Sequence, residues 1–168
     1  MASSPITDKK IIEQIKQKYL NKNQMRDLLL FLLSINTGIK PTELLKLSVS
    51  DIKNKDLLKI QEAYTKNKKE FSLENRKAKE PLFISIFGKA VDRMQVFRNF
   101  KEICVELGVG KECSVSSWRK TFGHNYYIKY GDLAILKWIF NQSTVAETLK
   151  FIGIKKKLNS NLNKEFCL

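Results

Sequence analysis

The chain is poor in the residues that build metal and nucleotide sites. It has one histidine and three cysteines among 168 residues, and the cysteines are too few and too scattered, with no Cys-x-x-Cys pair, for the closely spaced ligands of a structural zinc site. It has no G-x-G-x-x-G stretch and no Walker lysine motif, the glycine-rich loops that hold nucleotide phosphates. We therefore expect neither a metal nor a cofactor, and the odd number of cysteines argues against a disulfide framework.

Long apolar runs are also lacking. No stretch reaches the roughly 18 apolar residues that a membrane helix needs, and the start, MASSPITDKK, has no apolar signal-peptide core. These absences predict a cytoplasmic protein with no membrane partner. We interpret residues 1–6 as a leader that is disordered or left from cloning, in which case the chain is a fragment of a longer protein.

Acidic residues are scarce relative to basic ones. The sequence has 31 Lys+Arg against 17 Asp+Glu, a formal net charge of +14, and such an excess suits a polyanion because each neutralised phosphate releases counterions. Only five of the cations are arginine, the residue whose planar fork reads bases. The composition thus favours backbone contacts with double-stranded DNA; the plain alternative is a solvated basic surface.

Hydrophobic spacing predicts a single domain over residues 1–168 that is mainly α with a small antiparallel β-sheet, an α+β fold. Thr7 is the expected cap of the first helix, and the dense apolar block at 27–35 is expected as the central buried helix. The expected helices cover 8–20, 27–35, a short segment from Pro41, 91–107, and three further segments before a basic tail at 155–168.

The sheet is expected from three short runs. LLKIQEAY (57–64) and EFSL (70–73) are joined by the lysine-rich TKNKK, which predicts a hairpin with a basic tip. PLFIS (81–85) is the expected third strand.

Three separated segments resemble the conserved boxes of the tyrosine recombinases, or phage integrases. NTGIKPTELLKLSVSDI (36–52) is similar to the first box, and WRKTFGHNYYIKYGDLAILKWIFNQSTVAETLKFIGI (118–154) to the second and third. The lysine-tipped hairpin lies between them, in the family's order. The resemblance covers nearly the whole chain and implies the fold of the family's catalytic domain. In that family a tyrosine hydroxyl attacks a DNA phosphodiester, while two arginines and a histidine or tryptophan stabilise the phosphoryl oxygens, and another histidine and a hairpin lysine handle protons.

The sequence departs from the family at most of these positions. The first arginine is Lys40, and the nucleophilic tyrosine is Phe151, which keeps the ring and lacks the hydroxyl. The two histidine positions fall on Ser116 and Gln142. Arg119 stands where the second arginine is expected. These departures predict a degenerate site and a protein that is not an enzyme.

The surviving cations are the candidates for DNA binding. Arg119 is expected to anchor a phosphate, with Glu43, the acidic residue kept from the first box, orienting it. Arg93 and Arg98, on the expected 91–107 helix, are candidates for contacts beyond phosphate. Lys66 is the preferred match to the family's hairpin lysine. The full set of DNA-binding candidates is Lys40, Lys66, Lys68, Lys69, Arg93, Arg98, Arg119 and Lys120.

Three functions remain open. The first is a non-catalytic DNA-binding regulator or repressor of a prophage or plasmid in a bacterial host. The second is a divergent recombinase or nicking enzyme that uses Tyr126, Tyr127 or Tyr130, although these are more simply ordinary aromatics of an amphipathic helix. The third is an accessory subunit that pairs with an active integrase through the tail. We expect the chain to lack the N-terminal helical domain that closes the family's clamp around DNA, and we therefore also expect a homodimer or a partner recombinase domain.

Overall fold

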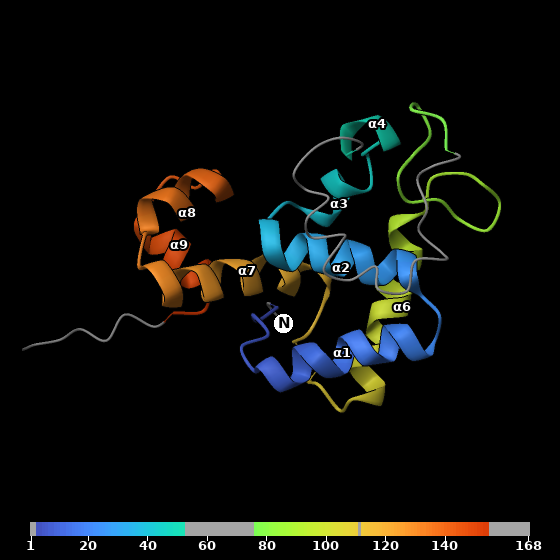
Figure 1. Ribbon diagram of the computed structural model, residues 1–168. Helices are drawn as coiled ribbons and strands as arrows, with labels where there is room; N and C mark the ends of the chain where they lie inside the picture. Colours follow the sequence, from blue (N-terminus) through green and yellow to red (C-terminus); the bar gives the residue numbers. More distant parts are fainter. Residues whose placement is uncertain (1–2, 53–75, 111, 155–168) are drawn as a thin grey trace, which may run out of the picture.

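The computed structural model describes residues 3–52, 76–110 and 112–154, and within them the chain is helical (Figure 1). The mainly α part of the predicted fold is confirmed. The helices are α1 (Lys9–Asn21), α2 (Met25–Thr37), α3 (Pro41–Leu44), α4 (Val49–Ile52), α6 (Arg93–Glu106), α7 (Val115–Tyr130), α8 (Leu133–Phe140) and α9 (Val145–Phe151).

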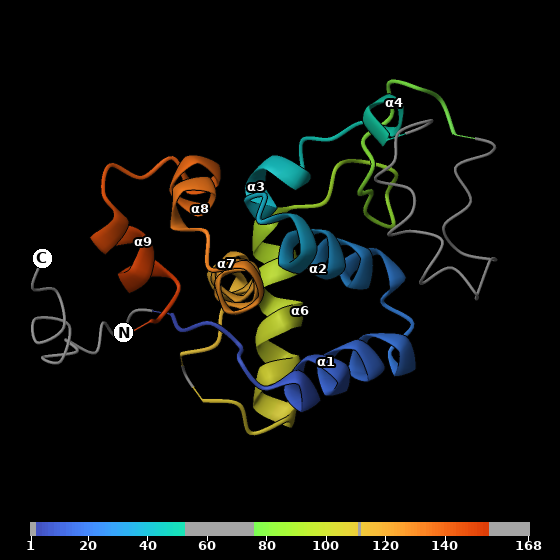
Figure 2. The same ribbon diagram turned by 60° about the vertical axis from the view of Figure 1, so that its left-hand side comes forward.

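Helix α2 forms the centre of the core, as its apolar density predicts. It contacts α1 on one side and α7 on the other, with α6 crossing behind (Figure 2). Phe31 is fully buried on α2, and the buried ring of Trp118 on α7 meets it edge-on at a centroid distance of 5.4 Å. Phe100 of α6 completes the cluster, 5.0 Å from Trp118. Trp118 is therefore a core residue.

Capping side chains decide where the helices begin. The carboxylate of Asp8 accepts a hydrogen bond from the backbone amide of Lys10, so α1 begins one residue later than a cap at Thr7 would place it. At α7 the Ser114 hydroxyl accepts from the Ser117 amide, and the Ser117 hydroxyl accepts from the Ser114 amide. This reciprocal box fixes the start of the helix that carries the second conserved segment.

The predicted sheet is not confirmed. The expected strands at 57–64 and 70–73, with the hairpin tip between them, lie outside the described residues. The run at 81–85 forms two isolated antiparallel bridges, Ser48 to Pro81 and Ile84 to Ala90, instead of a strand. Pro81 has no amide hydrogen to donate to a ladder, which limits pairing at the start of this run.

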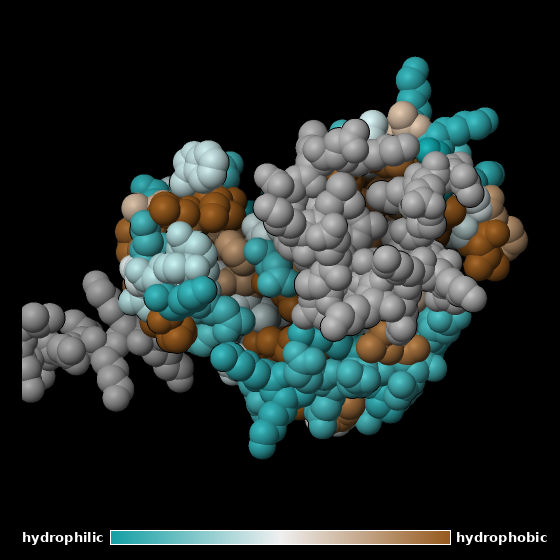
Figure 3. All heavy atoms as spheres, viewed as in Figure 1, coloured by the Kyte–Doolittle hydropathy of each residue, from teal (hydrophilic) through white to brown (hydrophobic). Residues whose placement is uncertain are grey.

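Helices α8 and α9 pack against the second half of α7 and form a small core of their own. Gly123 makes this packing possible, because a Cβ there would lie 2.6 Å from both Phe140 and Ile152. Hydrophobic side chains gather over α8, whereas mostly hydrophilic ones cover the side formed by α1 (Figure 3). Over the residues that the structure describes, no helix combines the length and apolarity needed to cross a membrane.

The segment before α1 lies along α7, although the sequence suggested a disordered leader. The Ile6 amide donates to the Thr121 hydroxyl at 2.8 Å, and the Ser4 amide donates to the Glu112 carbonyl at 3.1 Å. Ile6 itself is buried. The described residues 3–6 are thus part of the packed domain.

Candidate functional site

Arg119 is held in one orientation by backbone carbonyls on both sides of α7. Its Nε donates to the Gly38 carbonyl at 2.7 Å, and its Nη2 donates to the Ile139 carbonyl at 2.9 Å. The guanidinium also lies over the Phe140 ring, 4.8 Å from the centroid. These contacts use two of the five N–H donors of an arginine and leave three. Partial burial lowers the pKa of Arg119 from its ordinary value, but a guanidinium stays charged at neutral pH.

The Thr-Gly step of the first family-like segment explains why Arg119 can reach the Gly38 carbonyl. Gly38 ends α2 with a φ of 70°, a left-handed conformation that favours glycine. A Cβ at this position would lie 2.4 Å from the Phe122 ring of α7. Glycine therefore lets the end of α2 approach α7 closely enough for its carbonyl to meet Arg119.

Arg119 lines a pocket of about 360 Å³, here called the Arg119 pocket. Helices α3, α6, α7 and α9 contribute to it. Among its described lining residues three are cations and none is a carboxylate, so the lining is strongly positive. The residues are Lys40, Pro41, Thr42, Arg93, Phe97, Ser114, Val115, Ser116, Arg119 and Phe151.

The pocket brings together four of the positions singled out by the family resemblance. Lys40, Ser116, Arg119 and Phe151 are far apart in sequence and line the same hollow. The Ser116 hydroxyl lies 2.7 Å from the hydroxyl of Ser114. Ser114 also lines the pocket and was not among the residues predicted from the sequence. Its capping position before α7 was the signal that could have found it.

Phe151 fills its position by packing. Its ring lies 4.9 Å from that of Phe140, centroid to centroid. The Lys120 ammonium lies 5.3 Å from the Phe151 ring centroid and donates a hydrogen bond to the Ser3 carbonyl. Burial lowers the pKa of Lys120 from its ordinary value. Lys120, a predicted DNA contact, is thus engaged with the N-terminal segment.

Gln142, at the third-box histidine position, does not line the Arg119 pocket. Its backbone amide donates to the Lys137 carbonyl at 3.0 Å, just after α8. Its side-chain oxygen is buried, and no described residue donates a hydrogen bond to it. The structure therefore places Gln142 outside the Arg119 pocket.

Several other candidates lie away from the pocket. Glu43 does not orient Arg119, because its carboxylate pairs with Lys46, three residues on and just past the end of α3, at 3.0 and 3.2 Å. Arg98 is exposed, with its Nε 3.4 Å from the Met94 carbonyl. The hairpin candidates Lys66, Lys68 and Lys69 lie outside the described residues.

None of the three tyrosines considered as substitute nucleophiles lines the Arg119 pocket. Tyr126 packs between Phe122 and Tyr130, at centroid distances of 5.7 and 4.8 Å. Tyr127 lies in the small core formed with α8 and α9. The single histidine, His124, has its Nδ1 3.1 Å from the Ile152 carbonyl and also lies outside the pocket.

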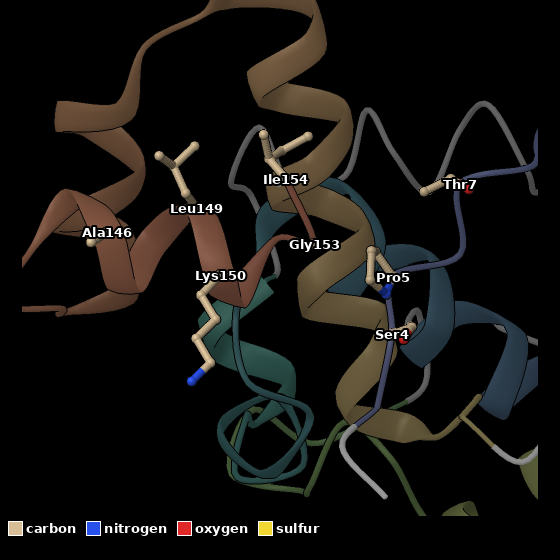
Figure 4. Close-up of a pocket in the computed structure, with 8 residues that line it drawn as sticks. All are labelled: Ser4, Pro5, Thr7, Ala146, Leu149, Lys150, Gly153 and Ile154. Atoms are coloured by element: carbon tan, nitrogen blue, oxygen red, sulfur yellow. The ribbon is translucent and has the colours of Figure 1, made fainter. Parts of the chain in front are cut away.

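A larger hollow, of about 670 Å³, lies between the N-terminal segment and α9 (Figure 4). Pro5 and Gly153 lie at its centre, and Lys150 is its only cation among the described lining residues. Its surface is mostly apolar and offers no cluster of charged or nucleophilic groups.

Comparison with known proteins settles the family. No protein-family model matches the chain. The chain is 33% identical over 175 residues to the Bacillus subtilis (strain 168) protein named "Probable integrase/recombinase YoeC", and the match covers 96% of each. The chain belongs to the integrase/recombinase family. Two solved recombinases share its fold: XerA, with a TM-score of 0.69 and 16% identity, and XerH, with 0.67 and 14%.

The XerH structure is a post-cleavage complex with a palindromic DNA substrate. This integrase/recombinase-family chain spans 60% of the XerA chain and 49% of the XerH chain, while 92% and 90% of its own residues are matched. These solved proteins confirm the tyrosine-recombinase fold that the three segments predicted.

The prediction that the chain is not an enzyme is wrong on this comparison. The relative that it matches over nearly its whole length is an integrase/recombinase, and integrases and recombinases are enzymes. The missing hydroxyl of Phe151 describes one position in the pocket and does not decide the activity of the protein.

Proposed function

We propose that this protein binds duplex DNA by holding a backbone phosphate in the Arg119 pocket, and that it acts in DNA recombination. The observation that carries the proposal is the convergence of Lys40, Arg93 and Arg119 on one hollow with no carboxylate in its described lining. A phosphate that enters a pocket loses part of its hydration, so cations in the lining have to balance its negative charge. The family membership and the DNA-bound XerH structure support it.

The pocket offers two kinds of contact to a phosphate. Arg119 is preorganised by its carbonyl contacts, so its remaining N–H groups meet a phosphate without reordering the side chain. Lys40, on the exposed N-terminal side of α3, adds a mobile point charge. The hydroxyls of Ser114 and Ser116 are further donors for phosphate oxygens.

Strand cleavage by this family requires a hydroxyl that attacks the phosphodiester. Phe151 has none, and the α7 tyrosines lie outside the Arg119 pocket. A covalent step therefore uses a hydroxyl from a residue other than Phe151. The site of attachment to DNA would identify that residue directly.

The test is fluorescence anisotropy with a labelled random-sequence duplex at rising salt, for the native chain and two matched variants. Lys40→Gln removes a cation of the pocket, and Lys101→Gln removes an exposed cation of α6 outside it. We expect Lys40→Gln to weaken binding and to reduce the slope of log affinity against log salt by about one. Lys101→Gln should leave both nearly unchanged.

Equal losses in the two variants, or no binding by the native chain, would refute the proposal. A denaturing gel of the same mixtures detects covalent adducts, and peptide mapping of an adduct locates the attacking residue. Mapping covers every hydroxyl-bearing residue, so it does not depend on a guess about which one attacks.

A further inference from the structure

The Arg119 pocket contains a guanidinium that the family resemblance does not account for. Arg93 is the first residue of α6, and it lines the pocket together with Lys40. Both side chains are exposed, and within the described part of the chain neither has an ion pair or a hydrogen-bond partner. As far as the described residues go, both cations are therefore available to an anion.

The orientation of α6 selects Arg93 for this pocket. Arg93 and Phe97 are four residues apart, so they share one face of the helix, and both line the hollow. Arg98 is five residues beyond Arg93, which turns it about 140° around the helix axis. It does not line the pocket. The two arginines, equivalent as candidates in the sequence, thus differ in the structure.

The pocket has one arginine fork in a fixed position and lacks the second where the family has it. Lys40 supplies a charge at the first-box position, but an ammonium cannot form the paired parallel N–H···O bonds that a guanidinium makes with phosphate. Arg93 approaches the same hollow from a different helix and carries such a fork.

We propose that Arg93 supplies the second guanidinium of the phosphate pocket and compensates for the lysine at position 40. This inference rests on the proposed function, since it assigns a role within the same site. It predicts a specific relation between two residues that are 53 positions apart. Arginine at position 93 matters because position 40 is lysine, and arginine at position 40 would make position 93 dispensable.

The test compares Arg93→Lys with Arg98→Lys by anisotropy on the same random-sequence duplex. Both changes keep the charge and remove a fork from the same helix. Arg93→Lys should weaken binding roughly ten- to hundredfold, the usual effect of losing hydrogen bonds to a charged group. Arg98→Lys should change it less than about threefold. Because Arg93 and Arg98 are both exposed, thermal melts of both variants should match the native chain.

The decisive variant is Lys40→Arg, made alone and with Arg93→Lys. It should have little effect alone and should restore most of the affinity lost in Arg93→Lys. Equal effects of Arg93→Lys and Arg98→Lys would overturn the inference, and so would a Lys40→Arg change that improves the native chain and the Arg93→Lys variant by the same factor. A native chain that binds no duplex would instead refute the proposed function, so the two failures are distinguishable.

Discussion

Replacement of Arg119 by lysine tests whether the pocket depends on a fixed fork or only on charge. The change keeps a cation at the end of a long side chain. It removes the geometry that lets one side chain contact the carbonyls of Gly38 and Ile139 at the same time, at 2.7 and 2.9 Å. A lysine ammonium at this site reaches one of these carbonyls.

The cost follows from the carbonyl that is left without a donor. Leaving a buried polar group unsatisfied costs about 1–3 kcal/mol, and Gly38 is buried between α2 and α7. For a domain of this size that corresponds to a fall in melting temperature of roughly 2–12 °C. Contact with the Phe140 ring persists in part, because an ammonium also interacts with an aromatic face.

Two measurements check this reasoning. Thermal unfolding followed by circular dichroism gives the change in stability, and anisotropy with duplex DNA gives affinity and its salt dependence. We expect lower stability and about tenfold weaker binding with an unchanged salt slope, because the charge is kept while the fork is lost. The control is Arg98→Lys, whose arginine is exposed and makes one long contact. Identical melting temperatures for the two variants would refute the role assigned to the carbonyls.

Three further changes have defined outcomes. Gly38→Ala forces alanine to a φ of 70° and toward the Phe122 ring, so urea unfolding should show a loss of at least about 1–3 kcal/mol. The rate of Cys113 alkylation by iodoacetamide, measured against pH in a chain with Cys167 replaced by serine, should rise at a lower pH than for an ordinary thiol. The reason is that a hydrogen bond from Cys104 lowers the pKa of Cys113. The further change Cys104→Ala should move this pH profile to higher pH, and an unmoved profile would contradict the assignment. Phe151→Tyr places a hydroxyl in a pocket of cations and should raise the yield of denaturation-resistant DNA adduct above the native level on a denaturing gel.

The helices could be predicted because their local signals agree with the tertiary structure. The apolar block at 27–35 has too many large side chains for a surface helix, and Phe31 within it is fully buried. Pro41 opens α3 at a favoured first position. Within the described residues the 81–85 run forms isolated bridges and no strand, and the partner edge that a strand needs cannot be read from the sequence of the run alone. Short apolar runs are ambiguous for this reason.

The pocket was only partly accessible from the sequence. Motif spacing identified Lys40, Arg119 and Phe151, because each has a family counterpart at a fixed offset. Glu43 was kept by the same logic, yet it contacts Lys46 instead of Arg119. Its partner lies three residues further along the same segment, just past the end of α3. Motif spacing therefore gives the position of a residue along a helix. The residue that its side chain contacts depends on the orientation of that helix in the fold.

Among the described residues, the pocket combines one cation held by backbone carbonyls, Arg119, with two that have no hydrogen-bond or ion-pair partner, Lys40 and Arg93. This division has a physical reason. A guanidinium fixed by carbonyls has lost its side-chain entropy during folding, so it binds a phosphate at little further cost. Lys40 and Arg93 lose theirs only when the anion arrives. Their contribution is therefore the more sensitive to side-chain geometry and salt. With the role proposed for Arg93, an exchange of arginine between positions 40 and 93 changes which helix supplies the second guanidinium and leaves Arg119 untouched. We therefore expect the site to tolerate the exchange as long as one of the two positions keeps a guanidinium.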